Sequence, residues 1–156
     1  MERLIFKSLL LVVFCLTLSS CTAYAGDVVK IARSQLGQGE MGGDNRGPVV
    51  KKYTNGQEVS WCAGFVSWTL KKAGKETPYL LAARSYLKHG KRVTKPQPGD
   101  IIVLTRKGGG HVGIVESVSG NNIVTIEGNK GKYPAVVKRV NYTLGKIPQL
   151  IAFVRV

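Results

Sequence analysis

The chain has 156 residues, of which 44% are hydrophobic and 21% are charged, a composition typical of one globular domain. Its three cysteines, Cys15, Cys21 and Cys62, argue against a disulfide-rich scaffold and against a cysteine-rich metal site. The net charge of +14 favours anionic partners.

Residues 1–25 have the features of an export signal. Arg3 and Lys7 precede the apolar run Leu9–Leu18, whose ten residues are too few to span a bilayer, and small residues follow. Later apolar runs are also too short for a membrane helix. We therefore expect the remainder of the chain to act outside the bacterial cytoplasm, either in the periplasm or secreted.

Two processing sites are compatible with this signal. The sequence AYAG predicts cleavage before Gly26, which leaves a domain over residues 26–156 with a net charge of +13. The sequence LSSC instead resembles a bacterial lipobox, in which residues 1–20 are removed and Cys21 carries a lipid anchor. The basic residues show no aromatic-interleaved patch and no nucleic-acid motif, so anionic wall polymers or a membrane surface are better expected partners than nucleic acid.

The first half of the domain predicts four helices. With their expected caps they cover residues 27–36, 48–53, 60–74 and 77–90. In the third helix, Ser60 is a natural N-cap and Gly74 a natural stop. The inner face expected for the fourth helix consists of Leu80, Ala83, Arg84 and Leu87.

After Gly90 the pattern changes to short strands separated by turns. A turn in residues 95–100 leads into a strand, and further strands are expected over residues 111–118, 123–129, 135–142 and 150–156. The sequence SGNN between the second and third of these is typical of a hairpin turn. Helices followed by an antiparallel meander of about five strands predict an α+β domain.

Cys62 would lie in the first turn of the third helix, where the partial positive charge of a helix N-terminus stabilises a thiolate. Trp61 beside it is a candidate substrate-binding wall of a cleft. Gly64 is unusual inside a helix and suggests the close approach of another element, such as a strand that carries a base. The alternative is a buried structural cysteine, because Cys62 also lies on the apolar stripe of the helix.

His111 follows GGG at the start of a strand and shares one face with Gly113 and Val115. From there an imidazole can accept the proton of a thiol. The other histidine, His89, is expected in the last turn of a helix, where a solvent or helix-dipole role is favoured. A histidine bonded to backbone near a turn is the alternative for His111.

Glu127 and Asn129 lie two apart on the expected hairpin partner of the His111 strand, and therefore on one face. Counting outward from the turn places them near His111, where either can fix the tautomer of the imidazole. Taken alone, EGNKG would read as a polar turn. Together with Cys62, the three positions predict a nucleophile, a base and an orienting group.

Glu40, Asp44 and Asn45 are weak candidate ligands for calcium in a polar loop, because they lack the dense oxygen ligands of an EF-hand. A solvated loop is the favoured interpretation, and we expect no cofactor. The two histidines lie apart in this reading, so a zinc site is not expected either.

Five segments carry a family resemblance: WCAGFVSWTLKKAG, ARSYLKHG, PQPGDIIVL, GGGHVGIV and IEGN. Their order and residue composition resemble those of CHAP domains. These are the cysteine, histidine-dependent amidohydrolase/peptidase domains, which are related to papain-like and NlpC-type cell-wall enzymes. The resemblance covers roughly residues 28–156. It implies a papain-like fold with N-terminal helices packed on the sheet.

The resemblance also implies a peptidoglycan hydrolase, an N-acetylmuramoyl-L-alanine amidase or an endopeptidase, and we expect a monomer. Cys62 resembles the nucleophile, His111 the base, and Glu127 or Asn129 the orienting residue. Some members of the family bind calcium before the cysteine, and the loop at Glu40 does not clearly reproduce such a site. The alternative function is a non-catalytic, basic protein that binds the cell wall or envelope on the same fold.

Overall fold

The structure is a computed structural model that describes residues 27–156. The predicted export signal, the lipidation of Cys21 and the cleavage before Gly26 lie outside the described residues. Within the described range, no helix combines the length and apolar character needed to cross a membrane.

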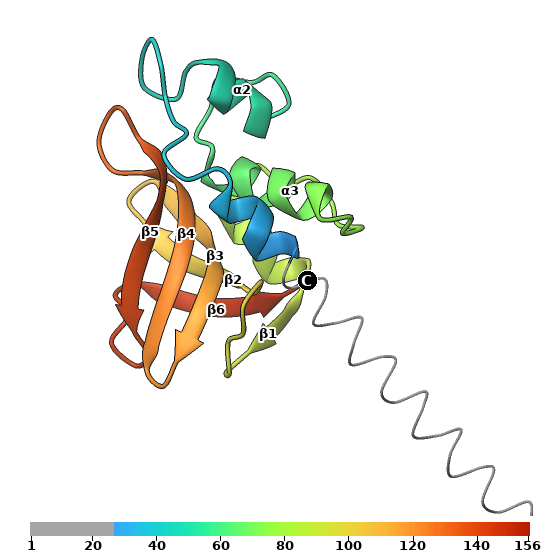
Figure 1. The fold of residues 1–156 in the computed structure, drawn as a ribbon, viewed down its shortest axis with the longest axis vertical. Coiled ribbons are helices and arrows are strands. Elements are labelled where there is room, and N and C mark those ends of the chain that lie inside the picture. Colours follow the sequence, from blue (N-terminus) through green and yellow to red (C-terminus); the bar gives the residue numbers. More distant parts are fainter. Residues whose placement is uncertain (1–26) are drawn as a thin grey trace, which may run out of the picture.

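The helices come first in the chain and lie together on one side of a sheet (Figure 1). A helical segment covers residues 27–33, and it is followed by α2 (Pro48–Tyr53), α3 (Cys62–Lys72) and the 3-10 helix η1 (Ala83–Lys88). The short helix predicted from Pro48 to Tyr53 is confirmed, with proline in its first turn as the sequence indicated.

The residue at the N-cap of α3 is Trp61, so the predicted N-cap, Ser60, is wrong by one position. The Ser60 hydroxyl instead accepts a hydrogen bond of 3.1 Å from the Asn129 amide. No side chain caps α3. The N–H groups of its first turn therefore keep their hydrogen-bonding capacity for a negative charge placed before them.

The helix predicted over residues 77–90 is wrong in its first half, because only Ala83–Lys88 are helical, and as a 3-10 helix. Ser67 of α3 bonds both the N–H and the C=O of Leu80, at 2.8 Å and 2.9 Å, which holds that backbone against α3 and away from helical pairing. With three residues per turn, Ala83 and Tyr86 face the core, whereas Arg84 is exposed rather than on the inner face as predicted.

The second half of the described chain forms one six-stranded antiparallel sheet. The strands are β1 (Lys91–Val93), β2 (Ile101–Arg106), β3 (Gly109–Ser119), β4 (Asn122–Lys130), β5 (Val136–Thr143) and β6 (Leu150–Arg155). In the order β1-β6-β2-β3-β4-β5, strands β2 to β5 form a meander and β6 returns beside β2. The α+β class and the five predicted strands are confirmed. The three-residue β1 was not predicted, because KRV carries little apolar pattern.

The sheet separates two apolar cores. On β2, Ile101 and Val103 pack in the core shared with the helices, whereas Ile102 and Leu104 pack in a second core on the opposite face. Figure 1 shows β6 running across the direction of β4, as expected for a strongly curled sheet. Both faces of β2 are covered, so its sequence reads as a continuous apolar run rather than as an alternation.

Gly64 allows close approach, as expected, but the element that approaches it is α2. A Cβ at Gly64 would lie 2.4 Å from the backbone oxygen of Tyr53. The glycine that meets the helix from the sheet is Gly128 of β4, where a Cβ would lie 2.7 Å from Cβ of Phe65. These two glycines bring α2, α3 and β4 together around the N-terminal turn of α3.

We expect Gly64→Ala to lower the free energy of unfolding by about 1–3 kcal/mol, because the new Cβ overpacks against the Tyr53 carbonyl. Helix propensity alone predicts the opposite sign, a gain of about 1 kcal/mol. Urea unfolding of both proteins decides between the two. Lys71→Ala, an exposed change on the same helix, is the control, expected within about 0.5 kcal/mol of the wild type.

Candidate active site

Cys62 is the first residue of α3, and only 4% of its surface is exposed. It is the free cysteine of the described residues. Its position combines an apolar setting, which disfavours a charged thiolate, with the uncapped N-terminus of an eleven-residue helix, which favours one. The neighbouring side chains decide which effect prevails.

His111 lies near the start of β3 and is buried, with 2% of its surface exposed. On one side of β3 the pairing continues along β2, where His111 is opposite Leu104. On the other side the residues paired with β4 end at Ile114 and Ile126. The N-terminal part of β3 is thereby left open on the β4 side, and the Val112 backbone is close enough to Cys62 to lower the pKa of its thiol.

The pKa values of Cys62 and His111 move in opposite directions. Burial raises the pKa of the Cys62 thiol, but the neighbouring His111, assisted by the Val112 backbone and the charge of Arg106, lowers it below its usual value. Burial lowers the pKa of His111, and Cys62 and Glu127 together raise it. Each of the two groups therefore stabilises the charged form of the other.

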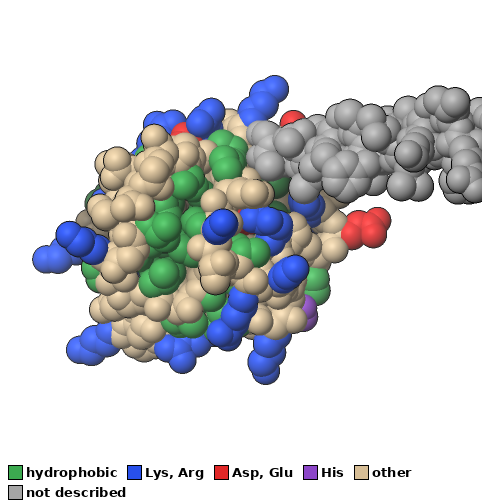
Figure 2. All heavy atoms as spheres, turned by 90° about the horizontal axis from the view of Figure 1, so that it is seen from below, with side chains coloured by type: hydrophobic (Ala, Val, Ile, Leu, Met, Phe, Trp, Pro, Cys, Tyr) green, Lys and Arg blue, Asp and Glu red, His purple; other side chains and the backbone are tan. Residues whose placement is uncertain are grey.

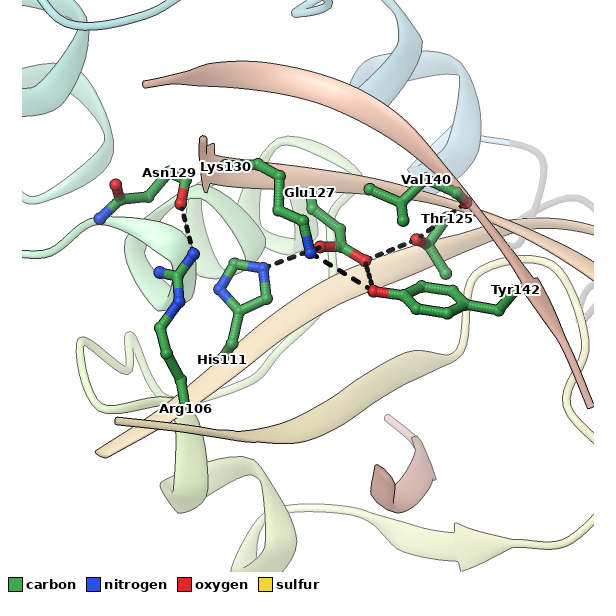
Figure 3. Close-up of polar contacts among 8 residues, drawn as sticks. All are labelled: Arg106, His111, Thr125, Glu127, Asn129, Lys130, Val140 and Tyr142. Carbon is green, nitrogen blue, oxygen red and sulfur yellow. Dashed lines mark hydrogen bonds and ion pairs between the residues drawn. The ribbon is translucent and has the colours of Figure 1, made fainter. Parts of the chain in front are cut away.

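The two ring nitrogens of His111 have different surroundings. Nε2 lies 2.8 Å from the Glu127 carboxylate (Figure 3). Nδ1 is buried, and within residues 27–156 it is the buried side-chain nitrogen or oxygen that has no partner of hydrogen-bonding geometry. Glu127 thus occupies one nitrogen and leaves Nδ1 as the nitrogen available to Cys62 and to a substrate.

The Glu127 side chain has no exposed surface, and its two oxygens receive four donors. The Oε1 atom accepts hydrogen bonds from Thr125 at 2.8 Å and from Tyr142 at 2.9 Å. The Oε2 atom is 2.8 Å from both His111 Nε2 and Lys130 Nζ (Figure 3). A buried carboxylate with all its neighbours acting as donors stays ionised and holds the imidazole in place.

A β-bulge at Glu116 places Glu127 on the same face as His111. The pairing shifts between Val115 and Ser117, so Ile114 lies opposite Ile126. Counting from the turn without this extra residue would place Ile114 opposite Glu127, on the face toward the helices, because opposite residues share a face. Glu116 is the residue left out of the pairing with β4. Its carboxylate forms ion pairs with Arg33 and Arg139, which hold the bulge in place.

Gly113 provides the room that Glu127 needs. It lies between His111 and Val115 on their common face, and a Cβ at Gly113 would be 2.5 Å from Cγ of Glu127. Any larger residue would push the carboxylate away from the imidazole. The second glycine of the Gly-His-Val-Gly pattern, Gly113, is therefore needed because a side chain at this position would collide with Glu127.

Asn129 does not contact His111, which corrects the expectation that it shares a face with Glu127. A second irregularity between Glu127 and Lys130, together with the positive φ of 54° at Asn129, turns its side chain away. Its amide donates to Ser60 and Asn45 instead, both at 3.1 Å. Asn129 thus ties the loop before α2 to the residues before α3.

Trp61 is fully buried, so the prediction that it forms the wall of a substrate cleft is wrong. Its ring stacks on Tyr53 at 5.6 Å between centroids, and its indole N–H donates to Glu40 at 3.1 Å. Glu40 also accepts from the backbone N–H groups of Asn45 and Ala135. Both oxygens of Glu40 thereby accept hydrogen bonds from N–H groups.

The weak calcium candidates do not form an acidic cluster. Asp44 is exposed, and its carboxylate accepts from the amide of Asn45. Among the described residues, no group of three or more His, Cys, Asp or Glu side chains could hold a metal ion. His89 is exposed and lies at the end of η1.

The residues that sequence reasoning missed are those that surround Glu127. Thr125 could have been found, since it lies two residues before Glu127 on the same face. Tyr142 and Lys130 could not, because their contacts depend on the register of β5 and on the irregularity in β4. Together with Arg106 and His111, Lys130 and Tyr142 line a pocket of about 220 Å³.

We expect Glu127→Gln to remove the pH-dependent contribution that the Glu127 carboxylate makes to the free energy of unfolding. Burial would raise the pKa of Glu127, but His111 and Lys130 lower it from 4.5 to about 2. Because the folded pKa is below the unfolded one, Glu127 stabilises the fold above pH 4.5, and up to about 3 kcal/mol is lost as the pH falls toward 2. In urea unfolding, the difference in the free energy of unfolding between wild type and variant should become smaller as the pH is lowered from 4.5 toward 2.

The exposed Glu58 provides the control for this measurement. Glu58→Gln should leave the curve of stability against pH parallel to that of the wild type. If the curve of Glu127→Gln were also parallel to that of the wild type, the conclusion that Glu127 is buried in its ionised form would be refuted.

Solved structures share the fold of this chain. The peptidoglycan hydrolase RipB from Mycobacterium tuberculosis has a TM-score of 0.58 and 19% identity, over 88% of this chain and 66% of that one. The crystal structure of Ly7917 has a TM-score of 0.55 and 20% identity, over 83% of this chain and 61% of that one. The chain thus spans less than two thirds of each of these neighbours, and the likeness establishes the papain-like fold.

A comparison with curated proteins found no match. The family model of the CHAP domain matches residues 52–129, which is half of the chain and includes Cys62, His111, Glu127 and Asn129. The matched segment runs from the end of α2 to the last residues of β4, and so contains the elements that carry Cys62, His111 and Glu127, α3, β3 and β4. The chain belongs to the CHAP domain family.

Proposed function

We propose that this domain hydrolyses an amide bond of peptidoglycan, in the stem peptide or the cross-bridge, by cysteine–histidine nucleophilic catalysis. The observation that carries the proposal is the pairing of a thiol at a helix N-terminus with an imidazole held by a buried carboxylate. A merely structural cysteine requires neither the ionised Glu127 nor a histidine at this position.

In the proposed reaction, the Cys62 thiolate attacks the carbonyl carbon of the amide. The His111 imidazolium gives the proton on Nδ1 to the amine nitrogen, the C–N bond breaks, and a thioester remains on Cys62. Water then attacks the thioester while His111 takes up its proton. The acid product leaves, and the thiolate and imidazolium are restored.

The first turn of α3 supplies donors for the oxyanion formed during attack. The first helical N–H to pair within α3 is that of Phe65, which bonds the Trp61 carbonyl. The N–H groups before it, including that of Cys62 itself, receive no side-chain cap. Free N–H groups at the nucleophile are what stabilisation of an oxyanion requires.

The substrate class is inferred from the family and from the named neighbours. RipB is a peptidoglycan hydrolase, and Ly7917 has been solved with the hydrolysis product of MDP. Amidase and endopeptidase activities use the same nucleophile and base. The substrate pocket decides between the two, and mass spectrometry of the digestion products identifies the bond that is cut.

We propose that the domain meets this substrate outside the cytoplasm, after export through the N-terminal signal. Figure 2 shows many Lys and Arg side chains around the rim and right of the centre of one face, with few acidic ones. Such a surface can hold the domain on anionic wall polymers by charge alone, with a strength that falls as salt is added. The alternative, a wall-binding protein without activity, uses the same surface but has no need of a reactive thiol.

The reactivity of Cys62 separates these two functions. We expect alkylation of Cys62 by iodoacetamide to follow a pKa below the usual 9.0, because His111 stabilises the thiolate. His111→Gln should shift the pH midpoint upward by at least about one unit, since burial then acts without an opposing charge. The measurement is the alkylation rate against pH, read on the Cys62 peptide by mass spectrometry.

His89→Gln, a change of the exposed histidine, is the matched control and should leave the midpoint unchanged. A Cys62 that remained inert in the folded protein near neutral pH would contradict the nucleophile and favour the binding function.

Digestion of purified peptidoglycan tests the activity itself. We expect the wild type to release new amino groups, and Cys62→Ala to lose on the order of 10³-fold or more of this activity because the nucleophile is removed. Circular dichroism and urea unfolding show whether the variant is folded. Equal release by a folded Cys62→Ala protein would refute cysteine catalysis.

A further inference from the structure

The pocket beside His111 has a strongly basic lining. Its volume is about 220 Å³, and the residues around it are Leu104, Thr105, Arg106, His111, Lys130, Tyr142, Pro148 and Gln149. No carboxylate lines it. The nearest one, Glu127, has no exposed surface and uses both oxygens on its four donors. Glu127 offsets part of the charge of His111 and Lys130, with which it pairs, but it forms no ion pair with Arg106.

Arg106 is the last residue of β2, and its guanidinium has capacity left for a ligand. One Nη donates to the backbone oxygen of Asn129 at 3.0 Å, and within residues 27–156 no carboxylate forms an ion pair with Arg106. The bend of β4 at Asn129, with its positive φ, aims this carbonyl at the guanidinium. Arg106 is thus oriented by one bond while its other N–H donors stay available.

Lys130 lies on the opposite side of the imidazole. Figure 3 shows Arg106 beside the ring edge that carries Nδ1 and Lys130 beside the edge that carries Nε2. Lys130 is 26% exposed at its side chain and shares its charge with Glu127. Arg106, with a planar fork that fits a carboxylate, is therefore better suited than Lys130 to pair with an anion.

The chemistry of hydrolysis determines which part of a substrate reaches this pocket. Glu127 occupies Nε2, so His111 delivers its proton from Nδ1. The leaving amine must then lie on the His111 side of the Cys62 sulfur. Arg106 lies beside the Nδ1 edge of His111 (Figure 3), and its charge acts on Cys62, so it is the cation next to the place where the residue attached to that amine would lie.

We propose that Arg106, supported by Lys130, forms a carboxylate-binding subsite for the residue on the amine side of the cleaved bond. The inference rests on the proposed hydrolase function and narrows its substrate class to peptides whose leaving residue carries a free carboxylate. Amidation of that carboxylate removes its charge and weakens recognition by Arg106 without touching the scissile bond.

Two peptide substrates of the stem-peptide type test the proposal, differing only in a free carboxylate or a carboxamide on the leaving residue. A charge-assisted hydrogen-bond pair predicts that the wild type prefers the acid by about ten- to a hundredfold in kcat/KM. Arg106→Gln should reduce this preference to less than about threefold, and Arg106→Lys should retain an intermediate part of it. Arg92→Gln, on the exposed edge strand β1, is the matched control and should keep the full preference.

The ratio of the two substrates is the decisive readout. Arg106 also lowers the pKa of Cys62, so its loss slows both substrates, but a change in the thiol affects both to the same degree. Equal kcat/KM for acid and amide in the wild type, or an unchanged preference in Arg106→Gln, would overturn the subsite.

A binding measurement with the Cys62→Ala protein tests the subsite even if the protein proves not to be a hydrolase. The two titrants are the amine-side peptide product and its carboxamide. We expect the acid to bind at least about tenfold more tightly. If the wild type hydrolyses neither substrate and the acid still binds in this way, the proposed function falls and the subsite stands. Equal binding of acid and amide, or no binding of either, would reject the subsite.

Discussion

A carboxylate without exposed surface costs several kcal/mol in a folded protein unless its oxygens are used by donors and cations. Glu127 is such a group, and strands β3, β4 and β5 each contribute donors to it. The requirement to satisfy this charge therefore fixes the relative positions of three strands. It also fixes the imidazole of His111, whose remaining nitrogen is the one that faces the chemistry of Cys62.

Two irregularities in the sheet make this arrangement possible. The bulge at Glu116 brings Glu127 onto the face of His111, and the bend at Asn129 turns that residue away, toward Ser60. The first irregularity aligns the charged pair. The second ties β4 to the segment before α3, so the end of the helix that carries Cys62 is positioned by the same strand that carries Glu127. Bulges beside active sites commonly aim side chains in this way.

Much of the fold could be predicted from local patterns. Pro48 as a helix-starting residue predicted α2, and alternating or continuous apolar runs predicted five of the six strands. The errors arose where a distant residue competes with a local signal. Thr77 and Pro78 are good helix-start residues, but Ser67 of α3 takes the backbone of Leu80. Ser60 is a good cap by type, but Asn129 occupies its hydroxyl.

The sequence by itself determined the unpaired thiol at a helix start, the strand histidine and the polar pair on the partner strand, because residue type and spacing carry this information. The tertiary structure decided that Glu127 rather than Asn129 meets the imidazole, that Trp61 is part of the core, and that Lys130, Tyr142 and Arg106 gather around the site. The physical reason is register. In a sheet, one additional residue moves every later side chain to the other face, and no local pattern announces where that residue is inserted.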